Sequence, residues 1–188
     1  MNNWDLINLT SNQVEHPEKP FVNFLARVYG RADKSTNFLD IGPGRSGRHT
    51  RLLEKCGFAV TAVDISHQCR AHFHGDINDL RCGAHTFDCI LDIKTLCQER
   101  DPPYEHIYSW LKKGGYFFSM IPSLRHRYEF NAVDIEHHKD YTYEFMRYVE
   151  ASNIDDMFQQ YAHVESYLYI EPLSPHKNLY SWVIEAQK

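Results

Sequence analysis

The sequence predicts an α/β protein built on one doubly wound, mostly parallel sheet. Three observations lead to this fold class. A short apolar run ends in a glycine-rich turn that opens a helix, and helical and strand-like segments then alternate along the chain. The length of 188 residues, with 43% hydrophobic residues, suits one domain with a sizeable core. We therefore expect a single compact unit.

The organising segment is NFLDIGPGRSGRHT, residues 37–50. Its apolar start suits a buried strand, and Gly42, Gly44 and Gly47 allow backbone angles and close approaches that a Cβ would block. A helix that begins near Gly47 would direct unpaired N–H groups and the positive end of its dipole at a ligand. A ligand with an anionic or polar end is expected here.

Two acids narrow the choice of ligand. Asp40 stands two residues before the first glycine and gives the pattern DxGxGxxG, where a dinucleotide site ordinarily has an apolar residue. A carboxylate at this position faces a cation. Asp64 ends the next apolar run, FAVTAVD, at the place where an acid can accept hydrogen bonds from the two hydroxyls of a ribose.

With these motifs the chain resembles the class I S-adenosylmethionine-dependent methyltransferases of the small-molecule type, from Phe38 to Met120. The resemblance implies a seven-stranded sheet with an antiparallel last strand. It also implies that the position of Asp40 lies near the methionine end of the cofactor, that the glycine turn wraps the methionine moiety and that Asp64 binds ribose. The expected cofactor-binding residues are Asp40, Gly42, Gly44, Arg45, Gly47, Asp64, Ile65, Asp76, Ile77 and Asp92.

Residues 1–36 are expected to form a lid and a first helix that make one compact unit with a cofactor-binding domain over residues 37–188. Apolar residues at helical spacing predict a helix over Phe21–Tyr29, which follows Pro20 and ends at Gly30. The preceding residues suit a loop or a short helix. Trp4 and His16 are lid candidates; alternatively, Trp4 fills an edge of the core and His16 is exposed.

The second crossover of the sheet is predicted to be short. A helix over Arg48–Cys56 leads to a strand over Phe58–Val63, and only HQCRAHFHG then separates the turn at residues 64–66 from Asp76. Parallel strands ordinarily need a crossover of about a dozen residues, so its helix is expected to be reduced to a turn. Ile65 and Ile77 could then sandwich the adenine ring, with Asp76 accepting from its amino group.

The same short piece carries His67, Cys69, His72 and His74, residue types that bind zinc. All four lie within eight residues that must also cross the sheet, so we predict a solvated, histidine-rich loop and no metal site. The five cysteines of the chain are an odd, scattered set, which favours reduced thiols over a disulfide framework.

Residues Phe87–Ile93 are predicted to form a central strand, with Asp92, Lys94 and Thr95 near the end where chemistry takes place in such sheets. Asp92 could alternatively orient the backbone of the following loop. Asp92, His126, Tyr128 and His137 are the weak candidates for a catalytic base; the catalytic residue itself is not predicted. For each of the three from residues 122–160, a place on the polar face of an ordinary solvated helix is the preferred interpretation.

Residues 101–104 spell DPPY, the box of amino-directed adenine methyltransferases. That box must leave the fourth strand directly, as a flipped base requires, whereas IKTLCQER intervenes here. We interpret it as a helix start with Asp101 as the cap. The helix is expected over Tyr104–Leu111, followed by a stop at residues 112–115. Strands are expected over Tyr116–Ile121, His163–Ile170 and Tyr180–Ala186.

The net charge of −5 argues against a nucleic-acid substrate, and no segment suits a signal peptide or a membrane span, so a cytoplasmic location is expected. We predict in-line transfer of a methyl group from S-adenosyl-L-methionine to a small-molecule acceptor. The alternatives are a dinucleotide-dependent oxidoreductase, a module that binds the cofactor without transfer, and a nucleic-acid methyltransferase. The sequence predicts no oligomeric state.

Overall fold

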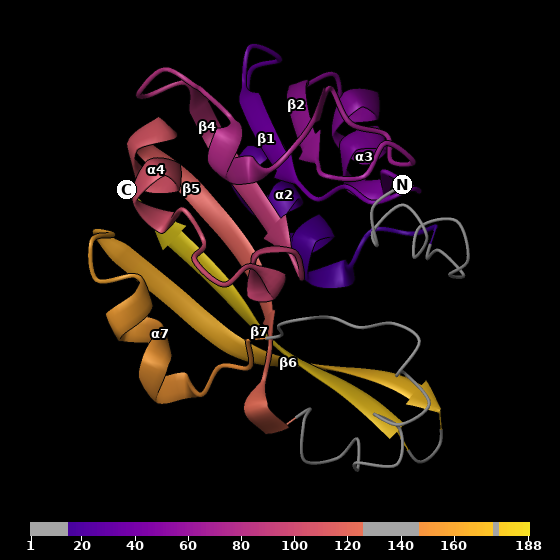
Figure 1. Cartoon of the computed structure of the whole chain (residues 1–188), viewed down its shortest axis with the longest axis vertical. Helices are drawn as coiled ribbons and strands as arrows, with labels where there is room; N and C mark the ends of the chain where they lie inside the picture. The colour runs from indigo at the N-terminus through magenta and orange to yellow at the C-terminus, as the bar shows by residue number, and fades with distance from the viewer. Residues whose placement is uncertain (1–14, 126–146, 175–176) are drawn as a thin grey trace.

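The structure is a computed structural model that describes residues 15–125, 147–174 and 177–188 (Figure 1). Its centre is a seven-stranded sheet in the order β3-β2-β1-β4-β5-β7-β6. All neighbouring strands are parallel except β7, which runs antiparallel to both β5 and β6. The predicted fold class is confirmed. The strands are β1 (Asn37–Ile41), β2 (Ala59–Asp64), β3 (Phe73–His74), β4 (Phe87–Ile93), β5 (Leu111–Pro122), β6 (His163–Ser174) and β7 (Lys177–Gln187).

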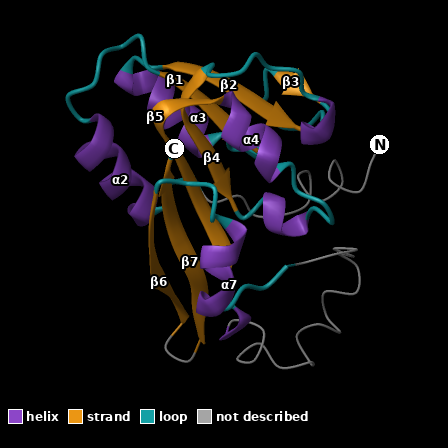
Figure 2. Ribbon diagram, turned by 90° about the vertical axis from the view of Figure 1, so that its left-hand side faces the viewer, coloured by secondary structure: helices purple, strands orange, loops and turns teal. Residues whose placement is uncertain are grey.

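Helices cover both faces of the sheet (Figure 2). The side chains of Phe38 and Leu39 point to opposite faces, as the two-residue period of a strand requires, and each belongs to a different apolar cluster. Phe38 packs with α2 (Lys19–Tyr29) and α3 (Arg48–Cys56), and Leu39 with α4 (Tyr104–Trp110) and α7 (Ala151–Met157). Two short 3₁₀ turns, η1 (Ile77–Asp79) and η2 (Leu96–Gln98), follow β3 and β4.

The shortened crossover is confirmed. Residues 65–72, all of them described, form no helix between β2 and β3, and β3 has two residues, which pair Phe73 with Val63 and His74 with Asp64. The expected break between α4 and the fifth strand is wrong, because β5 begins directly at Leu111. Residues 112–115 form an irregular start to β5 that shifts its register on β4; a Cβ at Gly115 would lie 2.9 Å from the carbonyl oxygen of Asp88.

In the described part of the chain, no helix has the length and apolar character needed to span a membrane.

Candidate functional site

A cavity of about 190 Å³ opens beyond the carboxyl ends of β1, β2 and β4. Such ends are where open parallel sheets bind ligands. Six of the ten predicted cofactor residues line it: Gly42, Gly44, Asp64, Ile65, Asp76 and Ile77. The other lining residues are Ile41, Val63, Gly75, Ile93, Lys94, Thr95, Gln98 and Glu99.

The glycine turn forms one wall of the cavity with its backbone. Gly42 and Gly44 have φ values of 68° and 65°, in the left-handed region that favours glycine. The N–H of Gly42 donates to the carbonyl oxygen of Val63 at 2.8 Å, and a Cβ at Gly42 would lie 2.2 Å from Oγ1 of Thr95. Only glycine therefore fits at this point of the wall.

Asp64 is 9% exposed and lies at the end of β2. Its Oδ1 accepts from the backbone N–H of Ser66 at 2.9 Å, and its Oδ2 from that of Gly44 at 3.1 Å. Each carboxylate oxygen can accept a second hydrogen bond. Asp64 can therefore accept from a ligand hydroxyl while it holds the glycine turn in place.

Another part of the cavity lining is apolar and acidic. Ile65 is 39% exposed and Ile77 is buried. Asp76 caps η1, with Oδ1 accepting from the N–H of Asn78 at 2.7 Å. Glu99, which sequence analysis missed, adds a second acid; burial and then the charge of Asp76 raise its pKa. Only the fold brings Glu99 to Asp76, so no motif could have revealed it.

Asp92 lies buried beneath the cavity and does not line it. Its Oδ1 accepts from the backbone N–H groups of Thr95 and Leu96, at 3.1 and 2.8 Å, and its Oδ2 accepts from Oγ of Ser119 at 2.7 Å. Burial raises the pKa of Asp92 to about 6, against the opposing effect of these hydrogen bonds. In this structure Asp92 orients the loop backbone after β4.

Asp40 also lies behind the cavity wall, 1% exposed. Its Oδ2 accepts from Oγ1 of Thr50 at 2.6 Å, which joins β1 to α3. Burial raises the pKa of Asp40, against the opposing effects of His49 and Thr50. Gly47 is the N-cap of α3, with φ of 53°, and Arg45 is exposed; neither lines the cavity.

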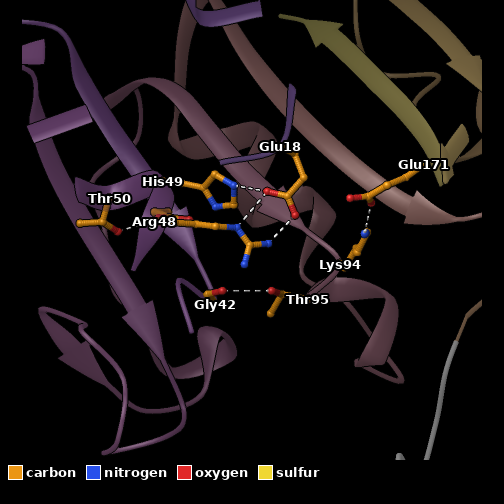
Figure 3. A network of polar contacts seen from close by, with 9 residues as sticks. Glu18, Gly42, Arg48, His49, Thr50, Lys94, Thr95 and Glu171 are labelled. Carbon is orange, nitrogen blue, oxygen red and sulfur yellow. Dashed lines mark hydrogen bonds and ion pairs between the residues drawn. The ribbon is translucent and has the colours of Figure 1, made fainter. Parts of the chain in front are cut away.

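A buried ionic cluster that no sequence motif indicated lies next to the glycine turn (Figure 3). Glu18, just before α2, accepts hydrogen bonds from Arg48 and His49 at the start of α3, and its side chain is 8% exposed. Burial raises the pKa of Glu18, but the hydrogen bonds from His49 and Arg48 outweigh this and hold it far below its usual range. Glu18 thus anchors the N-terminal segment, whereas the lid candidate His16 is exposed.

The DPPY segment does not face the cavity. The ring of Tyr104 packs edge-on against Phe117 and Phe158, with centroid separations of 6.3 and 5.7 Å, so it is unavailable to stack on a base. The expectation that Asp101 caps α4 is wrong. The N-cap is Pro103, no side chain caps the helix, and Asp101 is exposed.

The histidine-rich loop uses its imidazoles locally. Nδ1 of His72 accepts from the N–H of Ala62 at 3.0 Å, and Nδ1 of His74 lies 3.0 Å from the carbonyl oxygen of Ser66. Within residues 15–125, 147–174 and 177–188, no three side chains form a cluster that could hold a metal ion. The candidates Trp4, His126, Tyr128 and His137 lie outside the described residues.

The sequence matches the family model described as a methyltransferase domain over residues 14–162, most of the chain. The chain belongs to this methyltransferase family. The predicted enzyme class, a methyltransferase that uses S-adenosylmethionine, is thereby confirmed. No curated protein matches the sequence.

Solved structures of methyltransferases have the same fold. An S-adenosylmethionine-dependent methyltransferase from Methanosarcina mazei is 16% identical, with a TM-score of 0.62 and coverage of 92% of this chain and 98% of that one. The 1,6-didemethyltoxoflavin N1-methyltransferase of Burkholderia thailandensis, solved with its substrate and S-adenosylhomocysteine, is 21% identical, with a TM-score of 0.64 and coverage of 90% and 77%. A phosphoethanolamine N-methyltransferase of Haemonchus contortus is 14% identical, with a TM-score of 0.66 and coverage of 99% and 56%.

Proposed function

We propose that this methyltransferase binds S-adenosylmethionine in the cavity and transfers its methyl group to a small-molecule acceptor. The observation that carries the proposal is the meeting of Gly42, Gly44 and Asp64 with Ile65 and Ile77 around one cavity. These features fit the three parts of the cofactor. The glycine wall, which a Cβ would fill, suits the methionine moiety. The carboxylate can still accept hydrogen bonds from ribose, and the exposed apolar residue suits the adenine ring.

In this arrangement the glycine turn would hold the methionine moiety, and Asp64 would accept hydrogen bonds from the ribose hydroxyls. Ile65 and Ile77 would contact the adenine ring, with Asp76 near its amino group. The cofactor, when bound, supplies a methyl group already activated by the sulfonium. The protein's contribution is to hold acceptor and methyl group in line and to exclude water. Asp92 serves indirectly, since it fixes the loop that carries Lys94 and Thr95.

A small-molecule acceptor is supported by two observations. The net charge of −5 offers no basic field for a nucleic-acid backbone, and Tyr104, the ring of the DPPY box, is packed in the core. Among the structural neighbours, the enzymes from Burkholderia thailandensis and Haemonchus contortus were solved with small substrates.

Calorimetry with S-adenosylhomocysteine and with NAD tests the cofactor site, and we expect saturable binding of the first alone. Transfer from labelled S-adenosylmethionine to a panel of small amines, phenols and thiols, with DNA and RNA in parallel, tests the acceptor class. Label that appears only in nucleic acid would overturn the small-molecule assignment. Tight binding with no transfer to any acceptor would favour a binding module.

A further inference from the structure

The backbone of Lys94 adopts a conformation that side-chain-bearing residues rarely adopt. Its φ of 63° lies in the left-handed region, just after β4 ends. Two hydrogen bonds hold it there: the N–H of Lys94 donates to the carbonyl oxygen of Met120 at 3.0 Å, and Nε2 of Gln98 donates to the carbonyl oxygen of Lys94 at 2.5 Å. Strained backbone that is held in this way is found preferentially at ligand sites.

The side chain of Lys94 points from the cavity toward β6, the edge strand of the sheet. Lys94 lines the cavity, and its Nζ lies 3.9 Å from Oε2 of Glu171 on β6 (Figure 3). The two side chains are 30% and 40% exposed. An ion pair this long and this exposed contributes little to stability, so a ligand anion can replace Glu171 at the ammonium group without a large penalty.

The charges around the cavity are unevenly placed. Its ionisable lining residues are three acids, Asp64, Asp76 and Glu99, and one cation, Lys94. Asp64 and Asp76 lie at the end of β2 and at the start of η1, where the ribose and adenine are proposed to bind, and Glu99, just after η2, lies near Asp76. The cation lies at the end of β4, where a methyl group is expected to be presented. Because an ammonium and a sulfonium repel each other in a partly dry site, the loaded complex needs an anion beside Lys94, which either Glu171 or a ligand anion in its place can supply.

We propose that the Lys94 ammonium binds an anionic group, a carboxylate or a phosphate, of the methyl acceptor, and that Glu171 is the internal counter-ion this group displaces. The inference rests on the proposed function, since it takes the cofactor to fill the cavity beside Lys94. The other source of such an anion is the methionine carboxylate of the cofactor. The direction of the side chain favours the acceptor, because Lys94 points to Glu171 on β6 (Figure 3). Lys94 is thus a specificity residue.

The test is calorimetry on the protein saturated with S-adenosylhomocysteine, titrated with inorganic phosphate and with acetate. We expect saturable binding that Lys94→Met weakens by about tenfold or more and that Lys94→Arg retains. Glu171→Gln should tighten it several-fold, because it removes the competing carboxylate. Opposite signs for the two partners of one ion pair are not expected from a purely structural role.

The matched control is Lys112→Met. Lys112 also pairs with a carboxylate, Oδ2 of Asp88 at 2.8 Å, but at the opposite end of β4, so its loss should leave anion binding unchanged. Thermal melts establish that each variant is folded. Labelled transfer to phosphoethanolamine against ethanolamine, and to 4-hydroxybenzoate against phenol, then measures preference for the anionic member of each pair, which Lys94→Met should reduce.

Three results would overturn the inference. The first is that the wild-type complex binds neither anion, and the second is that Lys94→Met leaves anion binding unchanged. The third is that Lys94→Met weakens the binding of S-adenosylhomocysteine as strongly as the binding of the anion, which would assign Lys94 to the cofactor carboxylate. Failure of the wild-type protein to bind S-adenosylhomocysteine at all is a different outcome, and it would overturn the proposed function together with this inference.

Discussion

The carboxylate of Asp64, at the end of β2, accepts a hydrogen bond from the backbone N–H of Gly44, with 3.1 Å between the nitrogen and Oδ2. The acid proposed to bind ribose therefore also holds the turn proposed to bind methionine. Two motifs that lie 20 residues apart in the sequence form one structural unit. A change at Asp64 is expected to act on both.

Asp64→Ala should weaken S-adenosylhomocysteine binding by roughly 1.5 to 3 kcal/mol, the usual value of hydrogen bonds to a charged acceptor. It should also lower the melting temperature, because the N–H groups of Gly44 and Ser66 lose their acceptor. Calorimetry and thermal melts measure the two effects. Asp79→Ala, which removes an exposed acid in η1 outside the cavity lining, is the control with the same change of charge. Equal dissociation constants of both variants for S-adenosylhomocysteine would show that Asp64 does not bind the cofactor.

Gly42 should tolerate no side chain. Gly42→Ala combines a φ of 68° with a Cβ placed 2.2 Å from Oγ1 of Thr95, so we expect loss of several kcal/mol of stability or of soluble protein. Gly114→Ala is a matched control, since its φ is 78° but nothing lies within 4 Å of the added Cβ. It should cost only the backbone strain, about 1 kcal/mol. Urea unfolding of the two variants separates steric overlap from strain; similar losses would contradict the close packing at Gly42.

Glu18→Gln should destabilise the protein by about 3 kcal/mol, because it removes the charged acceptor that Arg48 and His49 share in a buried cluster. Glu15→Gln removes the exposed pair with Arg51 and should change stability far less, because solvent screens that pair. The comparison, made by urea unfolding at pH 7, sets a buried ion pair against an exposed one on the same two segments. A small effect at Glu18 would mean that the N-terminal segment is not anchored there.

The contribution of Glu18 to the stability of the protein should depend on pH. Its pKa is lowered in the folded state, so its contribution is present above the ordinary value of 4.5 and is lost as the pH falls below that. The difference in stability between the wild-type protein and Glu18→Gln should therefore shrink in acid. A difference that stays constant between pH 5 and pH 2 would argue against the ionised cluster.

Asp92 should show the opposite dependence on pH. Burial raises its pKa from 3.8 to about 6, so the folded state binds a proton that the unfolded state releases between these values. The stability contributed by protonated Asp92 is present below pH 4, falls as the pH rises and is lost above pH 6. The total change is about 3 kcal/mol.

Asp92→Asn isolates this effect, since an amide can still accept from the loop N–H groups and donate to Oγ of Ser119. Relative to the wild-type protein, the variant should gain stability on going from pH 4.5 to pH 7.5. Asp40, whose pKa burial also raises, is present in both proteins, so its own contribution largely cancels. Urea unfolding across this range measures the difference. A flat difference would show that Asp92 titrates normally.

The sequence was informative wherever a feature depended on local residues. The turn at Gly42 and Gly44, the strand-end acid Asp64 and the short crossover were predicted because strand, turn and length signals are read within a few residues. Glu18 was missed because its partners lie 30 residues away on another helix.

Cavity-lining residues of the loop after β4, such as Glu99, were also not predicted from the sequence. Which of the loop side chains reach the cavity depends on the backbone path that Asp92 and Ser119 impose, and Ser119 comes from the neighbouring strand. Glu99 therefore carries no recognisable motif. The helix cap at Asp101 failed for a smaller reason: the sequence located the start of α4 correctly, but a cap depends on the position of one residue, and the chain begins the helix after Pro103.

The DPPY segment is expected to serve the fold and not the chemistry. Asp101 is exposed and does not cap α4, so Asp101→Ala should change stability by less than about 0.5 kcal/mol and leave turnover unchanged. Tyr104→Ala should instead cost about 3 kcal/mol, because the ring is lost from its contacts with Phe117 and Phe158. Tyr104→Phe should be close to neutral, since the buried hydroxyl makes no hydrogen bond within the described structure. Thermal melts and initial rates on the same preparations distinguish a structural role of the segment from a catalytic one. If Asp101→Ala melts normally but is inactive, the segment is catalytic, and an adenine-like amino group becomes the leading acceptor.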